Sequence, residues 1–120
     1  MPISSLPNLD LNSNYILTSL TPLCGLTALS SLDMSFCERV TSLTPLSSLT
    51  GLSSLNMVSC RAVTSLTPLS GLTALRCLGV SWCKAVTSLE PLSTLTGLSS
   101  LKRAGCNAAG ALPPLLAHLQ

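Results

Sequence analysis

Leu20-Thr-Pro-Leu-Cys-Gly-Leu-Thr-Ala-Leu-Ser-Ser-Leu-Asp-Met-Ser-Phe-Cys-Glu-Arg-Val-Thr-Ser42 carries the pattern on which the chain is built. The pattern begins again at Leu43, Leu66 and Leu89, so its period is 23 residues. Residues 7–19 match the back half of an earlier unit. A fixed leucine period of this length is typical of a solenoid, in which each unit buries its apolar side chains against its neighbours.

One unit contains a strand signal. Leu32 and Met34 alternate with three polar residues, and this period of two is that of a strand with one buried face. The polar residues are Ser31, Asp33 and Ser35. Stacked units would therefore form a parallel sheet with one strand per repeat, and all three polar side chains are expected to face solvent.

A helix signal follows each strand. Thr44 fits an N-cap and Pro45 fits the first helical position, so one or two turns of α or 3₁₀ helix are expected. The Thr-Pro pair recurs at residues 21 and 67, and Glu90-Pro91 takes its place in the fourth unit. Gly51 and Gly97 stand where this helix must end.

The composition limits both the size of the fold and the classes of function. The 120 residues are 47% hydrophobic with one Trp, one Tyr and one Phe, so leucine must fill the core. We expect one domain over residues 1–120, with about four to five units. Leu9 already lies in a repeat phase, so a piece of a longer array is expected. A net charge of +2 does not favour nucleic acid, and no apolar run is long enough for a membrane span.

The repeat resembles a known family. The run Leu-x-x-Leu-x-Leu-x-x-Cys-x-x-Val-Thr-Ser-Leu-x-Pro-Leu-x-x-Leu is similar to leucine-rich repeats, and its Leu-x-Pro-Leu segment is similar to the internalin-like subclass. Leu-x-Met-Ser-x-Cys with Val-Thr-Ser-Leu also resembles leucine-rich proteins of trypanosomatid parasites. The likeness covers residues 7–112, but each unit is one residue longer than in internalins and has Cys where Asn is usual. It implies an α/β solenoid with a parallel β-sheet on the concave side and short helices or 3₁₀ turns on the convex side.

Four cysteines and one asparagine share a repeat phase. They are Asn14, Cys37, Cys60, Cys83 and Cys106. The family pattern implies a buried structural column in which Asn or Cys donates to backbone carbonyls of the turn. Disulfides between neighbours remain an alternative, although side chains in register suit bridging poorly. Zinc is disfavoured because there is no Cys-x-x-Cys pair. Buried thiols favour a reducing compartment, and hence the cytoplasm.

Nothing in the sequence indicates catalysis or a cofactor. The chain has a single histidine, His118, and no serine stands in a Gly-x-Ser-x-Gly elbow. We therefore expect a protein that is not an enzyme, in which His118 is a frayed or capping residue.

Two exposed columns are the candidate contact surface. The central strand position holds Asp10, Asp33, Asn56, Gly79 and Lys102, which grade from acidic to basic. Aromatic rings interrupt a column of small residues at Phe36 and Trp82, and Tyr15 lies nearby. Aromatic side chains are enriched in interface hot spots, although these rings could equally pack over Ser59 and Gly105. Arg61 and Lys84 could form a polar rim.

The carboxyl end departs from the repeat. Arg103 takes an inward phase, and residues 109–111 replace the usual Val and Thr-Ser, so a frayed or terminal unit is expected. Neither end has an evident polar cap, which predicts end-to-end self-association.

The expected role is a protein-binding scaffold with a protein partner. Two classes stay open: an intracellular signalling or regulatory adaptor, and an extracellular internalin-like adhesion or surface-antigen module. Self-assembly alone is a third possibility. The absence of a signal peptide and of Asn-x-Ser/Thr sequons favours the first class, with the cell surface as the alternative location if the chain is a fragment.

Overall fold

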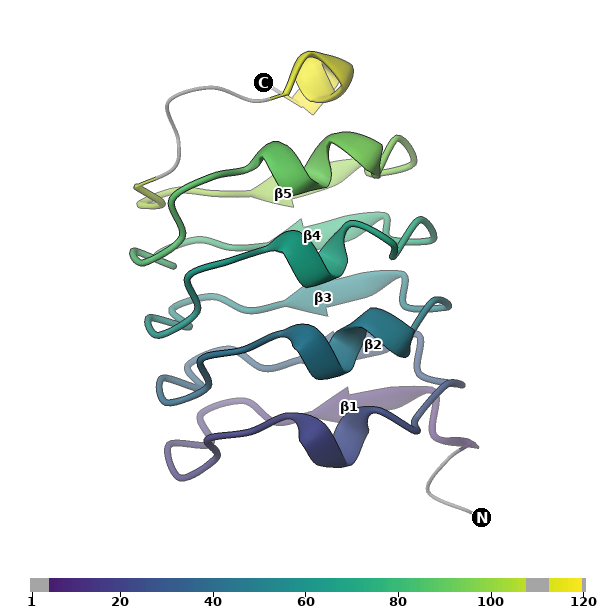
Figure 1. Cartoon of the computed structure of the whole chain (residues 1–120), viewed down its shortest axis with the longest axis vertical. Coiled ribbons are helices and arrows are strands. Elements are labelled where there is room, and N and C mark those ends of the chain that lie inside the picture. Colours follow the sequence, from purple (N-terminus) through teal and green to yellow (C-terminus); the bar gives the residue numbers. More distant parts are fainter. Residues whose placement is uncertain (1–4, 108–112, 120) are drawn as a thin grey trace.

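The computed structural model describes residues 5–107 and 113–119. Its five strands are three residues long and lie in one parallel sheet in chain order, stacked along the longest axis of the molecule (Figure 1). They are β1 (Asn8–Asp10), β2 (Ser31–Asp33), β3 (Ser54–Asn56), β4 (Cys77–Gly79) and β5 (Ser100–Lys102). The register follows the 23-residue period, since Leu9, Leu32, Leu55, Leu78 and Leu101 are successive partners. The predicted sheet is thereby confirmed.

Short 3₁₀ helices form the opposite, convex layer. They are η2 (Thr21–Leu23), η3 (Thr44–Ser48), η4 (Thr67–Leu69), η5 (Glu90–Thr94) and η6 (Pro114–Leu119). In Figure 1 the helices η2 to η5 lie in front of the strands and are stacked in the same order, and η6, in yellow, lies at the top end of the stack. Parallel strands, convex 3₁₀ turns and a fixed repeat make the chain an α/β solenoid, as expected.

The helix cap differs from the prediction. Threonine is the first helical residue and proline the second. The N-cap position is held by a leucine such as Leu43, whose side chain makes no capping hydrogen bond. The serine before this leucine caps the helix instead. The hydroxyl oxygen of Ser42 accepts a hydrogen bond from the backbone N–H of Thr44 at 3.2 Å. Ser19, Ser65 and Ser88 accept in the same way. A hydroxyl two residues before the N–H reaches it across a tight turn.

Helix length alternates along the stack. η2 and η4 span three residues and are followed within two residues by Gly25 and Gly71, whereas η3 and η5 span five. In the longer helices, the repeat position held by Gly25 and Gly71 is taken by a residue with a hydroxyl group. This hydroxyl donates to a backbone carbonyl of the preceding repeat. Ser48 donates to the carbonyl of Cys24 at 2.8 Å, and Thr94 donates to that of Ser70 at 2.6 Å. These bonds tie η3 and η5 to the preceding repeats.

The core between the two layers is an aliphatic ladder. Its buried side chains are leucine, methionine, valine and cysteine, and Leu32, Leu55 and Leu78 are at most 2% exposed. Leu9 and Leu101, in the first and last strands, are only half-buried. Each inner repeat therefore depends on both neighbours for burial, as in other solenoids.

One expectation about a single residue needs correction. Ser35 was expected to face solvent but is 3% exposed, because the strand ends at Asp33 and the alternation stops where the chain turns. The unit of Arg103 was expected to be frayed or terminal: Arg103 is half-buried, and β5 is the last strand of the described sheet and keeps its register with β4. The replacements at residues 109–111 lie outside the described residues. Within the described part, no helix is long and apolar enough to cross a membrane.

Candidate binding surface

The cysteine column supports the surface from inside. Cys37, Cys60, Cys83 and Cys106 are buried free thiols. The Sγ atoms of the first three donate to the carbonyls of Leu11, Met34 and Met57 at 3.2, 3.0 and 2.9 Å. These carbonyls lie 26 residues earlier, at the strand end of the preceding repeat. The thiols therefore link neighbouring turns, which holds the exposed turn residues in register.

Asn14 departs from this column. Its side chain is exposed, and its Oδ1 accepts the backbone N–H of Leu17 at 3.1 Å. No repeat precedes it among the described residues, so no carbonyl stands there for the amide to bind. Asn14 therefore organises its own turn and makes no link to a neighbouring one.

Burial makes the inner thiols poor acids. Desolvation raises the pKa of Cys60 to about 12 and that of Cys83 to about 11, and it also raises the pKa of Cys37. A thiol that stays protonated keeps its donor hydrogen and is a weak nucleophile. Among the described residues, no three His, Cys, Asp or Glu side chains are placed to hold a metal ion.

The aromatic column occupies a backbone conformation that side chains rarely adopt. Ser13, Phe36, Ser59, Trp82 and Gly105 all have positive φ, between 59° and 72°. For a bulky residue this left-handed conformation is an outlier and costs roughly 1–2 kcal/mol. The sequence indicated the column through its aromatics, but this backbone conformation was missed. The serines and Gly105 in the same phase were its signal, since small residues are common at such turns.

Trp82 packs on Gly105 and remains half-exposed. A Cβ atom built on Gly105 would overlap the Trp82 ring atoms Cε3, Cδ2 and Cζ3, so the indole lies directly over the glycine. Trp82 is nevertheless 49% exposed, and Lys84 Nζ lies 5.7 Å from its ring centroid. Packing and exposure are therefore combined in one residue. Phe36 is 38% exposed, and Ser59, next in its column, is 5% exposed.

The charged column runs beside the aromatic one. Its members are Tyr15, Glu38, Arg61, Lys84 and Asn107. Tyr15 is 55% exposed. Arg61 Nε lies 3.6 Å from Glu38 Oε2, and an exposed ion pair of this kind contributes little to stability. The charges therefore shape the surface potential more than they hold the fold.

The central strand column is less uniformly exposed than predicted. Asp10, Asn56 and Lys102 are exposed, but Asp33 is half-buried and Gly79 is buried. Partial burial raises the pKa of Asp33, yet hydrogen bonds from the N–H of Ser35 and the amide of Asn12 outweigh it, and the pKa lies below its ordinary value. Asn56 leans over Gly79, since a Cβ there would stand 2.9 Å from Asn56 Oδ1. A hollow of about 220 Å³ spans this part of the sheet, with Lys102 in its lining.

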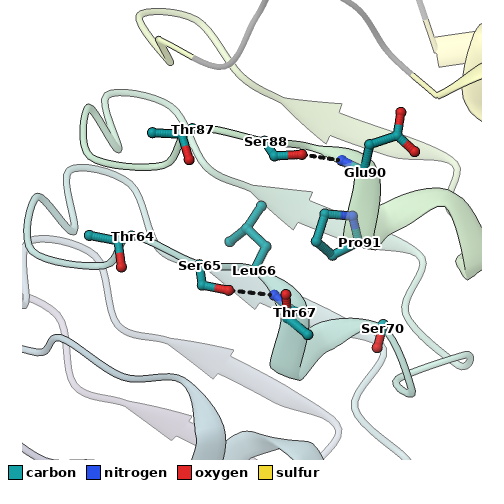
Figure 2. Close-up of a pocket in the computed structure, with 9 residues that line it drawn as sticks. All are labelled: Thr64, Ser65, Leu66, Thr67, Ser70, Thr87, Ser88, Glu90 and Pro91. Atoms are coloured by element: carbon teal, nitrogen blue, oxygen red, sulfur yellow. Dashed lines mark hydrogen bonds between the residues drawn. The ribbon is translucent and has the colours of Figure 1, made fainter.

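A different kind of surface lies on the helix side. Open grooves between successive repeats are lined by threonine and serine, and Figure 2 shows the one between the third and fourth units. Its dashed lines mark the N–H groups of Thr67 and Glu90 bound by Ser65 and Ser88. Glu90 is the only charged residue in the linings of these three grooves. The other charges of the chain lie away from these grooves.

Replacing Gly105 with Ala tests the seat of the Trp82 ring. The new Cβ displaces the indole, and the alanine has to adopt a left-handed backbone conformation. A loss of about 1–2 kcal/mol in the free energy of unfolding is therefore expected. Tryptophan emission should shift to the red as the ring becomes more exposed. Gly71→Ala is the matched control, because its Cβ would meet no atom within 4 Å. Unchanged emission in Gly105→Ala would contradict the stacked geometry.

Comparisons with known proteins identify the class. The structure resembles an internalin, InlF, of Listeria monocytogenes at a TM-score of 0.75 and 30% identity, covering 82% of this chain and 28% of that one. It resembles internalin C2 of the same organism at 0.74 and 28% identity, covering 98% of this chain and 49% of that one. No protein-family model and no curated protein matches the sequence. The chain is a leucine-rich repeat protein with an internalin-like solenoid, and it spans about half or less of the length of these two internalins.

Proposed function

We propose that the chain is a protein-binding module that uses the aromatic edge, defined as Phe36, Trp82 and the charged column beside them. The observation that carries the proposal is Trp82, a half-exposed indole held in a left-handed conformation on a glycine. Unfavourable backbone conformations are held in place by the surrounding structure, and they cluster at functional sites. Exposed aromatics in a chain with three in all are suited to act as hot spots. The internalin-like neighbours support a protein-interaction module, and the proposed role is non-catalytic.

The proposal concerns binding and leaves the compartment open. Six free thiols, two of them exposed, favour a reducing compartment and the intracellular adaptor. The likeness to internalins gives no support to a cytoplasmic location and favours the adhesion class. Fractionating the source cells, with an antibody to this chain, separates the two.

An affinity pull-down from a lysate of the source organism tests the binding role. The intact chain is compared with a Phe36→Asn/Trp82→Asn variant, because asparagine tolerates positive φ and should leave the fold intact. Ile16→Ala is the control, since Ile16 is 84% exposed but lies outside the aromatic column. A partner retained by the intact chain and the control, and lost by the Asn variant, is expected. Equal retention by all three would contradict the proposed surface.

Self-assembly is the second candidate function. β1 and β5 are the outermost strands of the described sheet, and Leu9, Leu11 and Leu101 are only half-buried. Asp10 and Lys102 share one strand column at opposite edges, so stacking two copies in register, with η6 displaced from the end of the core on which it packs, would bring them together. Light scattering should then show a mass that rises with concentration, and Lys102→Glu should lower it. A constant monomer mass would exclude this candidate.

A further inference from the structure

The spacing of the two aromatic side chains indicates what kind of partner fits. Phe36 and Trp82 are members of one column two repeats apart, with Ser59 between them. Neighbouring parallel strands lie about 4.8 Å apart, so the two positions are separated by about 9.6 Å along the solenoid. A partner that uses both rings must therefore present two apolar groups at about this distance on one face.

This distance discriminates between a helix and a strand. In an α-helix, residues i and i+7 share a face and lie about 10.5 Å apart. In a strand, residues that share a face are separated by about 6.7 or 13 Å, and the residue at about 10 Å points the other way. The intermediate helical position i+3 or i+4 would come opposite Ser59, which is 5% exposed and offers little surface of its own, so Phe36 and Trp82 are the main contacts. The column therefore fits a helix that lies along the solenoid axis.

The charge distribution gives that helix a direction. The first half of the chain carries a formal charge of −2, and the second half carries +4. The residues of the first half are Asp10, Asp33, Glu38 and Arg39. Those of the second half are Arg61, Arg76, Lys84, Glu90, Lys102 and Arg103. Arg39 and Arg61 reduce the negative potential near Phe36. Near Trp82, Lys84 and Lys102 together give a positive potential. The negative, carboxyl end of a helix is favoured at the Trp82 end.

We propose that the aromatic edge binds an amphipathic α-helix of a partner protein. Its apolar residues at i and i+7 cover Phe36 and Trp82, and its acidic carboxyl-terminal half lies toward Lys84 and Lys102. This inference rests on the proposed binding function and adds the class of partner and its orientation. Lys84 already lies over the indole, so it is placed to contact an acidic side chain at the edge of the ring.

Three synthetic peptides of identical composition, lacking Trp and Tyr, test the inference. The first is a stapled helix with apolar residues at i, i+4 and i+7, a basic amino-terminal half and an acidic carboxyl-terminal half. The second has the charged halves exchanged. The third keeps the charges of the first but scatters the apolar residues around the helix. The charge order of the first peptide opposes the helix dipole and would lower its helicity. All three peptides are therefore stapled, and circular dichroism verifies that their helicity is equal.

Emission of the single tryptophan, Trp82, is the readout. The first peptide should give a saturable blue shift and bind at least fivefold more tightly than the second and the third. Phe36→Asn should weaken it about tenfold, Ile16→Ala should have no effect, and Lys84→Glu should reduce the preference for the first peptide over the second. Absence of a saturable shift, or equal binding of the first and third peptides, would overturn the helical partner. Equal binding of the first and second would overturn the orientation.

The result is separable from that of the pull-down. A partner captured through the aromatic residues, combined with failure of the peptides, rejects the helical class and leaves the binding module standing. Failure of both experiments rejects the binding surface as well.

Discussion

Replacing Leu55 with Ala is expected to lower the free energy of unfolding by about 2–5 kcal/mol. Leu55 is 1% exposed in the central strand and stands between Leu32 and Leu78 in register. Removal of its isobutyl group leaves a cavity that opens on both neighbouring repeats, and β-sheet pairing on each side limits how far they can collapse into it. Because a domain's total stability is about 5–15 kcal/mol, this one change should remove a large part of it. Urea unfolding followed by circular dichroism measures the loss.

Leu9→Ala is the matched control for Leu55→Ala. Leu9 occupies the same column, but it is half-buried and has a described strand on one side only. A cost of about 1–2 kcal/mol is expected there, which is smaller than the central value. Equal losses at the two positions would show that the repeats do not depend on their nearest neighbours in the way the ladder implies.

Alkaline pH is expected to destabilise the protein through its buried thiols. In the folded chain the pKa of Cys60 is about 12 and that of Cys83 about 11, whereas an unfolded cysteine titrates near 8.5. A raised folded pKa means that the unfolded state loses its protons first. The stabilisation is therefore complete below about pH 8.5 and is lost as the pH rises toward the folded values. Two such thiols give a slope of roughly 2–3 kcal/mol per pH unit between pH 9 and 11.

Urea unfolding at a series of pH values measures this slope. A Cys24→Ser/Cys77→Ser background removes the two exposed thiols, which would otherwise form intermolecular disulfides. Cys60→Ala and Cys83→Ala in that background should each lower stability at neutral pH, because a Sγ–carbonyl bond is lost, and each should flatten the alkaline slope. An undiminished slope in the double alanine variant would assign the alkaline effect to other groups.

Much of the fold was predictable because one pattern is repeated. The alternation of Leu32 and Met34 gives a strand with one buried face, and the period places five such strands side by side. The position of the cap was not predictable in the same way. Serine and threonine both suit a helix start, and the choice of Ser42 depends on the bridge-region backbone at Leu43, which no composition rule reveals.

The candidate surface was predicted only in outline. The rarity of aromatics identified Phe36 and Trp82, but their positive φ values and the seat of the indole on Gly105 follow from the turn geometry. Asp33 illustrates the same limit. Its place in a polar column predicted full exposure, whereas hydrogen bonds to Asn12 and Ser35 hold it half-buried. Contacts between residues about 23 apart in sequence arise only after the repeats have stacked.

The repeat alone established the solenoid, its parallel strands and its leucine core, because side-chain periodicity dictates which face of each strand and helix must be buried. Stacking established the rest. It set the alternating helix lengths, since Ser48 and Thr94 reach carbonyls one repeat away, and it set the acceptors of the buried thiols. Each of these features depends on two neighbouring repeats. A hydrogen bond between them forms only where the side-chain donor of one repeat comes within reach of a backbone carbonyl of the other.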